Sequence, residues 1–296
     1  MSYDKYKPLI APARAKAQIW RLGAGIALTM LVMFGLGRGV VTLLHMVLGD
    51  AAFRAFWAEV QTGMTPAGLL FLLSSMGTVG LATIVTARVM HRRGAGTLFG
   101  PRRAFWGQFL RVAFAIAALQ AAMAVLPPWP KFDDLQPGLP TGLWLQLLPL
   151  TLIALMIQTG SEELFFRGYL QSQLAARFSH PGVWLVLPSA LFALGHYVPT
   201  IYDENALWVA LWAFIFGVTA ADLTARSGTL GPAIALHLVN NFMAIAVTAL
   251  PGDMSGLALY QLPFGAQDAE AMRAVLPLDL ATLIVSWLAA RLALRA

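Results

Sequence analysis

The fold of this chain is decided by the stretch Gly160-Ser161-Glu162-Glu163-Leu164-Phe165-Phe166-Arg167-Gly168-Tyr169-Leu170, which follows the hydrophobic run Leu143–Ile157. Only 11% of all residues are charged and 58% are hydrophobic, so two carboxylates and a guanidinium beside such a run are conspicuous. Placing each charge at membrane depth costs about 2.5–3.5 kcal/mol on insertion scales. Charges retained at that cost usually serve function, so this stretch is predicted to hold a functional site.

Composition indicates a polytopic membrane protein. The 296 residues have a mean hydropathy of +0.69, and long apolar runs recur along the chain. The absence of cysteine excludes disulfides, thiolate nucleophiles and cysteine-ligated metals. The net charge of +6 does not indicate nucleic acid, because the basic residues lie between apolar runs and do not form a stripe on a soluble face.

Apolar runs predict about eight transmembrane helices in one all-α bundle, with the site in its core. The runs are Leu22–Leu48, Ala67–Val89, Phe105–Leu126, Leu143–Gln158, Val183–Tyr197, Leu207–Thr224, Pro232–Leu250 and Ala274–Leu294. The first run is too long for a cleaved signal peptide and reads as a retained membrane helix. We therefore predict a basic cytoplasmic N-terminal tail over residues 1–21 and one membrane domain over residues 22–296.

The placement of Lys and Arg predicts the orientation. If the N-terminus is cytoplasmic and the eight runs alternate sides, Lys and Arg fall mainly inside and most acidic residues fall outside. We therefore expect a multi-pass protein of the cell (plasma or inner) membrane with both termini cytoplasmic. The proline-rich segments Pro127–Pro130 and Pro137–Pro140 are predicted to break the chain in an external loop.

The two glutamates are expected to differ. On a helix, Glu163 and Arg167 are four residues apart on one face, with the acid first, which favours an ion pair. Glu162 points about 100° away from that face and lacks this partner, so it is a candidate general base or acid. The alternative is structural: both glutamates would cap a helix start, with Ser161 as the N-cap.

Two further pairs combine a histidine with a residue one helical turn away. Phe192 and His196 share a face at the end of the fifth run, where a lone histidine is more often a packed, hydrogen-bonded residue than a catalyst. His237 and Asn241 share a face in the seventh run. Their donors either stabilise an oxyanion or join two helices by hydrogen bonds.

The predicted topology brings these groups only partly together. Glu162 is expected at the inner end of the fourth helix, close in depth to His237 and Asn241. A straight fifth helix running outward would place His196 near the opposite side. The fourth and fifth runs are short, so re-entrant or interfacial backbone beside the glutamates is a further expectation.

Three motifs, in this order, resemble those of the CAAX-protease and bacteriocin-processing (CPBP, or Abi) family of intramembrane proteases, which includes the CAAX prenyl endopeptidase. They are Glu162-Glu163-x-x-x-Arg167, Phe192-x-x-x-His196 and His237-x-x-x-Asn241. The segment Arg226–Pro232 is similar to that family's lead-in to its last motif. The resemblance covers about Leu143–Leu250, the protease-like core.

The resemblance implies an intramembrane endopeptidase that cleaves a membrane-embedded or lipidated peptide within the lipid bilayer. Glu162 would activate water as general base, and His196 would orient that water. His237 and Asn241 would stabilise the tetrahedral oxyanion. Residues implied to support the site are Glu163, Arg167 and Phe192.

No cofactor is preferred, and zinc is the alternative. Glu162, His196 and His237 are a possible zinc set. There is no His-Glu-x-x-His signature, and Asn241 is a poor zinc ligand but a natural oxyanion donor. Two other functions stay open. One is a non-enzymatic membrane scaffold or immunity-type protein that binds a membrane partner. The other is a transporter with Glu162 as proton relay, although the chain lacks the repeat symmetry typical of transporters.

Overall fold

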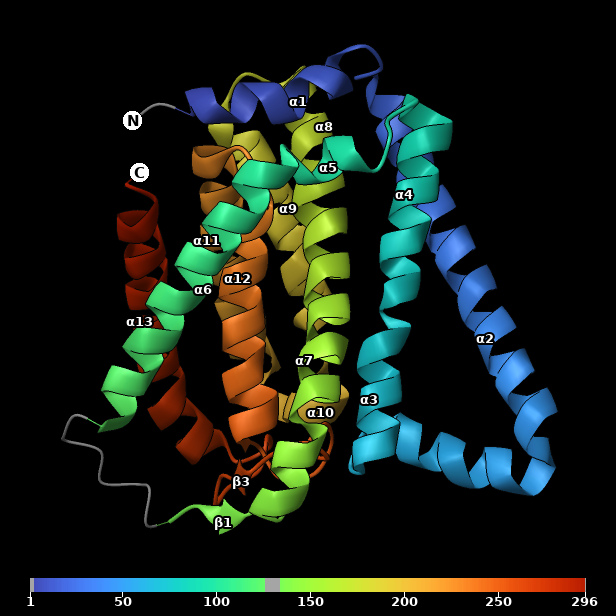
Figure 1. Cartoon of the computed structure of the whole chain (residues 1–296), viewed down its shortest axis with the longest axis vertical. Coiled ribbons are helices and arrows are strands. Elements are labelled where there is room, and N and C mark those ends of the chain that lie inside the picture. The colour runs from blue at the N-terminus through green and yellow to red at the C-terminus, as the bar shows by residue number, and fades with distance from the viewer. Residues whose placement is uncertain (1–2, 126–133, 296) are drawn as a thin grey trace.

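The computed structural model describes residues 3–125 and 134–295. Over these residues the chain is an all-α membrane protein whose long helices stand side by side (Figure 1). Six helical stretches are long and apolar enough to cross a membrane, and two shorter apolar helices accompany them. They coincide with the eight apolar runs, so the predicted polytopic all-α fold is confirmed.

The helices follow one another with short connections. Those of the first half are α1 (Lys7–Arg14), α2 (Ile19–Thr62), α3 (Pro66–Ser75), α4 (Gly77–His91), α5 (Gly96–Phe99) and α6 (Arg102–Val125). Those of the second half are α7 (Thr141–Glu163), α8 (Ser172–Arg177), α9 (Pro181–His196), α10 (Pro199–Tyr202), α11 (Ala206–Ser227), α12 (Gly231–Asn241) and α13 (Ala269–Leu294).

Shorter elements complete the chain. Two are 3-10 turns, η1 (Asp4–Tyr6) and η3 (Asp203–Asn205), and two are π-helical, η2 (Leu164–Gln171) and η4 (Phe242–Val247). A small sheet has the order β1-β3-β2, formed by β1 (Gln136–Pro137), β2 (Thr248–Ala249) and β3 (Tyr260–Gln261). In it β3 pairs antiparallel with β1 and parallel with β2.

The first membrane helix ends at a kink. Within α2, Gly49 has φ 72° and ψ 168°, a backbone conformation that only glycine adopts without strain. The apolar run Leu22–Leu48 stops at this point. Beyond it the rest of α2 turns sideways and runs along the end of the bundle opposite the chain termini, towards α3 (Figure 1).

The glutamate segment lies inside a continuous helix. Together α7, η2 and α8 form one stretch, Thr141–Arg177, of 37 residues. The expectations of re-entrant backbone here, of Ser161 as an N-cap, and of Glu162 at the inner end of the fourth helix are therefore wrong. The sequence after the glutamates continues the helix because its apolar side chains are buried, including Leu164, Phe165 and Tyr169.

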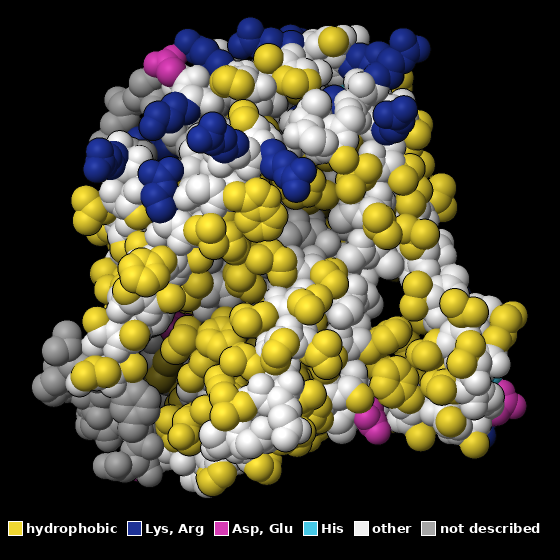
Figure 2. Space-filling model, in the orientation of Figure 1, with side chains coloured by type: hydrophobic (Ala, Val, Ile, Leu, Met, Phe, Trp, Pro, Cys, Tyr) yellow, Lys and Arg dark blue, Asp and Glu magenta, His cyan; other side chains and the backbone are white. Residues whose placement is uncertain are grey.

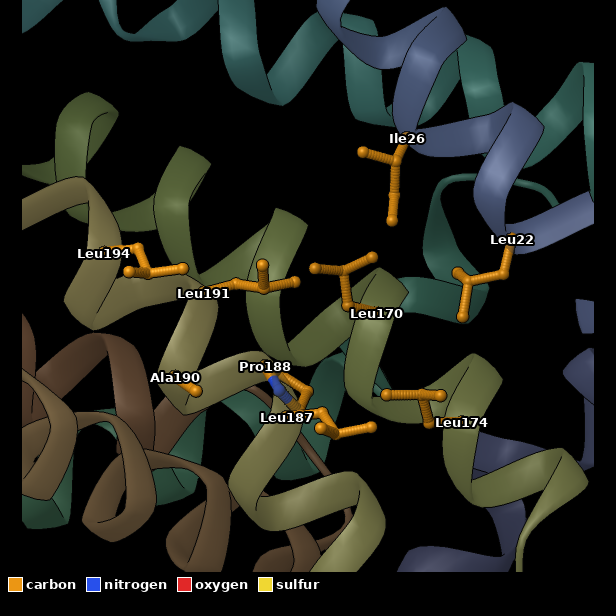
Figure 3. A pocket seen from close by; sticks show the side chains of 9 residues that line it. All are labelled: Leu22, Ile26, Leu170, Leu174, Leu187, Pro188, Ala190, Leu191 and Leu194. Atoms are coloured by element: carbon orange, nitrogen blue, oxygen red, sulfur yellow. The ribbon is translucent and has the colours of Figure 1, made fainter.

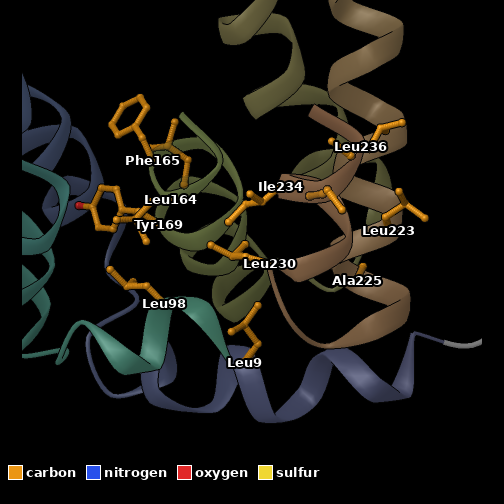
Figure 4. Packing of buried hydrophobic residues seen from close by; sticks show 14 of the residues in the cluster. Leu9, Leu98, Leu164, Phe165, Tyr169, Leu223, Ala225, Leu230, Ile234 and Leu236 are labelled. Carbon is orange, nitrogen blue, oxygen red and sulfur yellow. The ribbon is translucent and has the colours of Figure 1, made fainter. Parts of the chain in front are cut away.

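The N-terminal segment is folded onto the bundle. Figure 1 shows α1 lying across the end that carries both termini. Its buried side chains, with one from η1, are Tyr6, Leu9, Ile10 and Ala13. Leu9 packs in the main hydrophobic cluster with Leu98 and Leu230 (Figure 4). The predicted tail is thus a cap on one end of the bundle.

Hydrogen bonds fasten this cap to α11 and α13. The Tyr3 hydroxyl donates to Asp222 Oδ1 at 2.8 Å, and Arg226 Nε donates to the same carboxylate at 2.8 Å. Trp287 Nε1 donates to Asp222 Oδ2 at 3.0 Å. Burial, followed by the Asp222 hydrogen bond, raises the pKa of Tyr3 to about 12, so its hydroxyl stays a donor at neutral pH.

Charge is unevenly divided between the two ends. Figure 2 shows Lys and Arg side chains gathered at the end that carries α1, with hydrophobic side chains around the middle. Of the predicted external proline segments, Pro127–Pro130 lies outside the described residues. Pro137 lies in β1 and Pro140 directly precedes α7.

Candidate active site

Glu163 is the centre of a buried charge network. One of its oxygens, Oε1, accepts a hydrogen bond from Arg167 Nη1 at 2.8 Å and lies 2.8 Å from His237 Nδ1. The side chains of Glu163 and Arg167 are both 0% exposed. Arg167 also donates from Nη2 to the carbonyl oxygen of Gly217 at 3.1 Å. The ion pair expected from the spacing therefore forms, and it joins α7, η2, α11 and α12.

This geometry sets the proton positions on His237. A carboxylate only accepts hydrogen bonds, so the Glu163 contact places a proton on His237 Nδ1. The other nitrogen, Nε2, is then a lone pair in neutral imidazole and a donor in imidazolium. The carboxylate at Nδ1 favours the imidazolium form, as in other carboxylate–histidine pairs.

Glu162 faces the opposite edge of the same imidazole. Its Oε2 lies 3.7 Å from His237 Nε2, beyond direct hydrogen-bond distance. Among the described residues, this oxygen is buried and has no hydrogen-bond partner. Two neighbouring glutamates thus flank one histidine, one of them bonded to it and the other separated from it by a gap.

Gln158 belongs to the site, although sequence reasoning missed it. Its amide Nε2 donates to Glu162 Oε1 at 2.8 Å, and its Oε1 accepts from Asn241 Nδ2 at 2.9 Å. The signal was a polar residue one turn before Glu162 on the same face of an apolar helix. Gln158 holds Glu162 and links it to Asn241.

His196 joins the cluster through packing. Its ring centroid lies 4.3 Å from that of Phe192, which in turn lies 6.0 Å from the ring of His237. His196 Nδ1 contacts the carbonyl oxygen of Phe192 at 2.8 Å, so the proton sits on Nδ1 and Nε2 is left as an acceptor. No hydrogen bond or ion pair between described residues joins His196 to Glu162.

The depth of His196 differs from that of a straight, membrane-spanning fifth helix. The 16 residues of α9 span about 24 Å, less than the roughly 30 Å of a bilayer core. The helix stops at His196, so this residue lies within the bundle and not at its far end.

A close helix contact positions the acceptor for Arg167. At Gly217, α11 approaches α9 so closely that a Cβ would lie 2.8 Å from Ser189 Cβ and 3.0 Å from Ser189 Cα. The absence of a side chain lets the two backbones meet, and the Gly217 carbonyl oxygen accepts from Arg167 at this point.

The described residues do not form a metal site. No group of three His, Cys, Asp or Glu side chains among them is arranged to hold a metal ion. The alternative zinc set of Glu162, His196 and His237 therefore does not converge in this geometry, and we route no chemical step through zinc.

Comparison with known proteins identifies the family that this core resembles. Residues 142–243 match the family described as type II CAAX prenyl endopeptidase, Rce1-like. This segment is Rce1-like. The family resemblance of the three sequence motifs is thereby confirmed, because the match runs from the start of α7 to just beyond Asn241 in η4.

A bacterial relative matches a segment of the same size. The uncharacterized protein YyaK of Bacillus subtilis (strain 168) is 29% identical over 103 residues, which are 34% of this chain and 34% of the relative. The alignment thus spans about a third of the length of this curated relative. No solved structure matches the chain. The comparisons therefore relate the Rce1-like segment, and not the flanking helices, to known proteins.

Proposed function

We propose that this protein is an intramembrane endopeptidase that hydrolyses a peptide bond with water activated by Glu162. The observation that carries the proposal is the 3.7 Å gap between Glu162 Oε2 and His237 Nε2 in the Rce1-like segment. A water about 2.8 Å from each of these atoms fits such a separation. That water would have a carboxylate base on one side and an imidazole on the other.

The reaction follows from these groups. The water oxygen attacks the scissile carbonyl carbon while Glu162 Oε2 takes a proton from the water. The carbonyl oxygen becomes an oxyanion. His237 Nε2–H, in the imidazolium form favoured by Glu163, donates to it. Glu162 then passes its proton to the leaving amine as the C–N bond breaks.

Asn241 supplies a second oxyanion donor. Its Nδ2 carries two hydrogens, and only one is needed for the bond to Gln158. The other is available to the oxyanion, beside His237 one helical turn away. His196 has its acceptor nitrogen Nε2 on the neighbouring helix and is assigned to orient the water. Phe192 packs against His237 and holds the two histidines in place.

The position of the site indicates the class of substrate. Glu162 and His237 lie within a helical bundle whose outer surface is apolar, so the scissile bond reaches them from the membrane. We propose a membrane-embedded or lipidated peptide as substrate.

We also propose that the end of the bundle carrying both termini faces the cytoplasm of a cell membrane. Lys and Arg gather at that end (Figure 2), as cytoplasmic loops require.

The test compares peptide termini in the membrane fraction of cells that express either the wild-type chain or Glu162→Gln at equal abundance. We expect new termini only with the wild type, because the amide does not accept the proton of water. The matched control is Glu270→Gln, which makes the same change at an exposed residue of α13. This variant should yield the wild-type set of termini.

Identical termini for wild type and Glu162→Gln would contradict the proteolytic mechanism. They would favour a non-enzymatic scaffold or immunity-type protein that binds a membrane partner. The unfolding temperature of both variants in detergent is measured alongside, so that loss of cleavage is separated from loss of fold.

A further inference from the structure

A groove lies between α11 and α13, away from the candidate active site. It has a volume of about 320 Å³, at the lower end of the range for ligand pockets. Residues of α11 on its wall are Trp208, Leu211, Trp212 and Ile215, and those of α13 are Arg273, Leu276, Pro277 and Leu280. Both helices are membrane-spanning stretches, so the apolar part of this groove opens to lipid.

Charged side chains stand at one end of the groove. Arg273 lines it and donates from Nη2 to Glu204 at 3.0 Å. Their side chains are 53% and 70% exposed, so both remain accessible. Both belong to the starts of their helices, at the end of the bundle opposite the chain termini. Trp208 is half exposed beside them, where aromatic side chains meet lipid headgroups.

A second groove provides a contrast. It has a volume of about 290 Å³ between the start of α2, η2, α8 and α9, and Figure 3 shows its aliphatic lining. Its lining includes no charged or polar side chain that would select a headgroup. The α11/α13 groove differs because a cation and an anion stand together at its mouth.

We propose that the α11/α13 groove binds one zwitterionic phospholipid. The acyl chain lies between Ile215 and Leu276, the phosphate contacts Arg273, and the ammonium group contacts Glu204. The charge order fits a phosphoethanolamine headgroup, in which a phosphate and an ammonium are joined by two carbons. This inference is independent of the proposed proteolytic activity.

The test titrates the purified full-length chain in detergent with phosphatidylethanolamine and counts bound lipid by native mass spectrometry. We expect one tight site in the wild type. Arg273→Ala should weaken that site by about fivefold, the value of one basic residue near a phosphate. This arginine is exposed, so the variant is expected to fold.

The groove itself is tested with a matched pair of tryptophans. Leu276→Trp fills the groove and should abolish the tight site. Leu278→Trp makes the same change two residues away, at an exposed position of α13 that does not line the groove, and should leave binding unchanged. Phosphatidylglycerol, which lacks the ammonium, should bind the wild type more weakly, and Glu204→Gln should remove this preference.

Equal binding by Leu276→Trp and Leu278→Trp would overturn the proposal, because the lipid would then be part of the general annulus around the protein. Unchanged binding by Arg273→Ala would overturn it as well. If Leu276→Trp does not fold, the Arg273 and Glu204 variants still decide the outcome.

Discussion

Glu162 and Glu163 are neighbours in sequence but occupy opposite edges of one imidazole. Glu163 is fully buried and bonds to both Arg167 and His237. Glu162 bonds to Gln158 through one oxygen and, among the described residues, leaves the other without a partner. One carboxylate therefore holds the site together, and the other is available for chemistry. This division was inferred from helical spacing, whereas the bond from Glu163 to His237 was not.

The structural role of Glu163 predicts a loss of stability. Glu163→Gln leaves the Arg167 charge buried without its counterion, which costs about 3–5 kcal/mol in comparable buried pairs. Chemical unfolding in detergent measures this difference. Glu162→Gln, the matched change one residue earlier, removes no ion pair to Arg167 and should lower stability by less than about 1 kcal/mol. Equal losses for the two variants would contradict the assignment.

The oxyanion role of Asn241 predicts a kinetic effect. Asn241→Ala should lower kcat by about 10²–10³-fold and leave KM nearly unchanged, because the donor acts mainly in the transition state. A cleavage assay with a substrate found by the termini comparison measures both constants. Asn240→Ala removes the same amide from the adjacent position, where its contact to Asn241 is 3.4 Å long, and should retain most activity. A loss confined to KM would refute the role.

At the scale of elements, the site depends on where helices change course. The π-helical η2 follows the glutamates directly and brings Arg167 to Glu163 and to the carbonyl of Gly217. Helix α9 stops after 16 residues, which keeps His196 within the bundle. Small residues at 213, 217 and 221 of α11 are buried, a spacing that lets membrane helices approach closely.

This close approach gives a prediction for Gly217. In Gly217→Ala the added Cβ lies within 3.0 Å of Ser189, so α9 and α11 must separate, at a cost of about 1–3 kcal/mol for overpacking. The separation also moves the carbonyl that binds Arg167. Thermal unfolding in detergent measures the loss. Gly107→Ala, in α6, meets nothing within 4 Å and should be neutral or stabilising. A Gly217→Ala variant as stable as Gly107→Ala would contradict the packing argument.

At the scale of the whole molecule, both termini lie at one end of the bundle (Figure 1). That end carries the basic side chains and is capped by α1. A chain with an even number of crossings returns to the side on which it began, in agreement with the eight apolar runs. The cap reaches the site indirectly, because His91 contacts both the Lys16 carbonyl oxygen and the Tyr169 hydroxyl of η2 at 2.9 Å.

The proposed orientation predicts which side chains are reachable from outside the cell. The chain has no cysteine, so single substitutions can be labelled cleanly. A membrane-impermeant maleimide should label Asp253→Cys in intact cells and Lys7→Cys only after lysis. Both positions are exposed and lie at opposite ends of the bundle. The reverse labelling pattern would place the termini outside.

The sequence by itself determined the membrane class, the eight apolar runs, the i, i+4 ion pair and the three motifs. Each depends on composition or on spacing within one helix, where a fixed rise and rotation relate the residues. Only the tertiary structure decided that His237 bonds to Glu163, that Gln158 joins Glu162 to Asn241, that α9 stops at the depth of His196, and that the basic N-terminal segment packs as a cap. These contacts depend on how helices distant in sequence rotate and cross, and local spacing does not specify that.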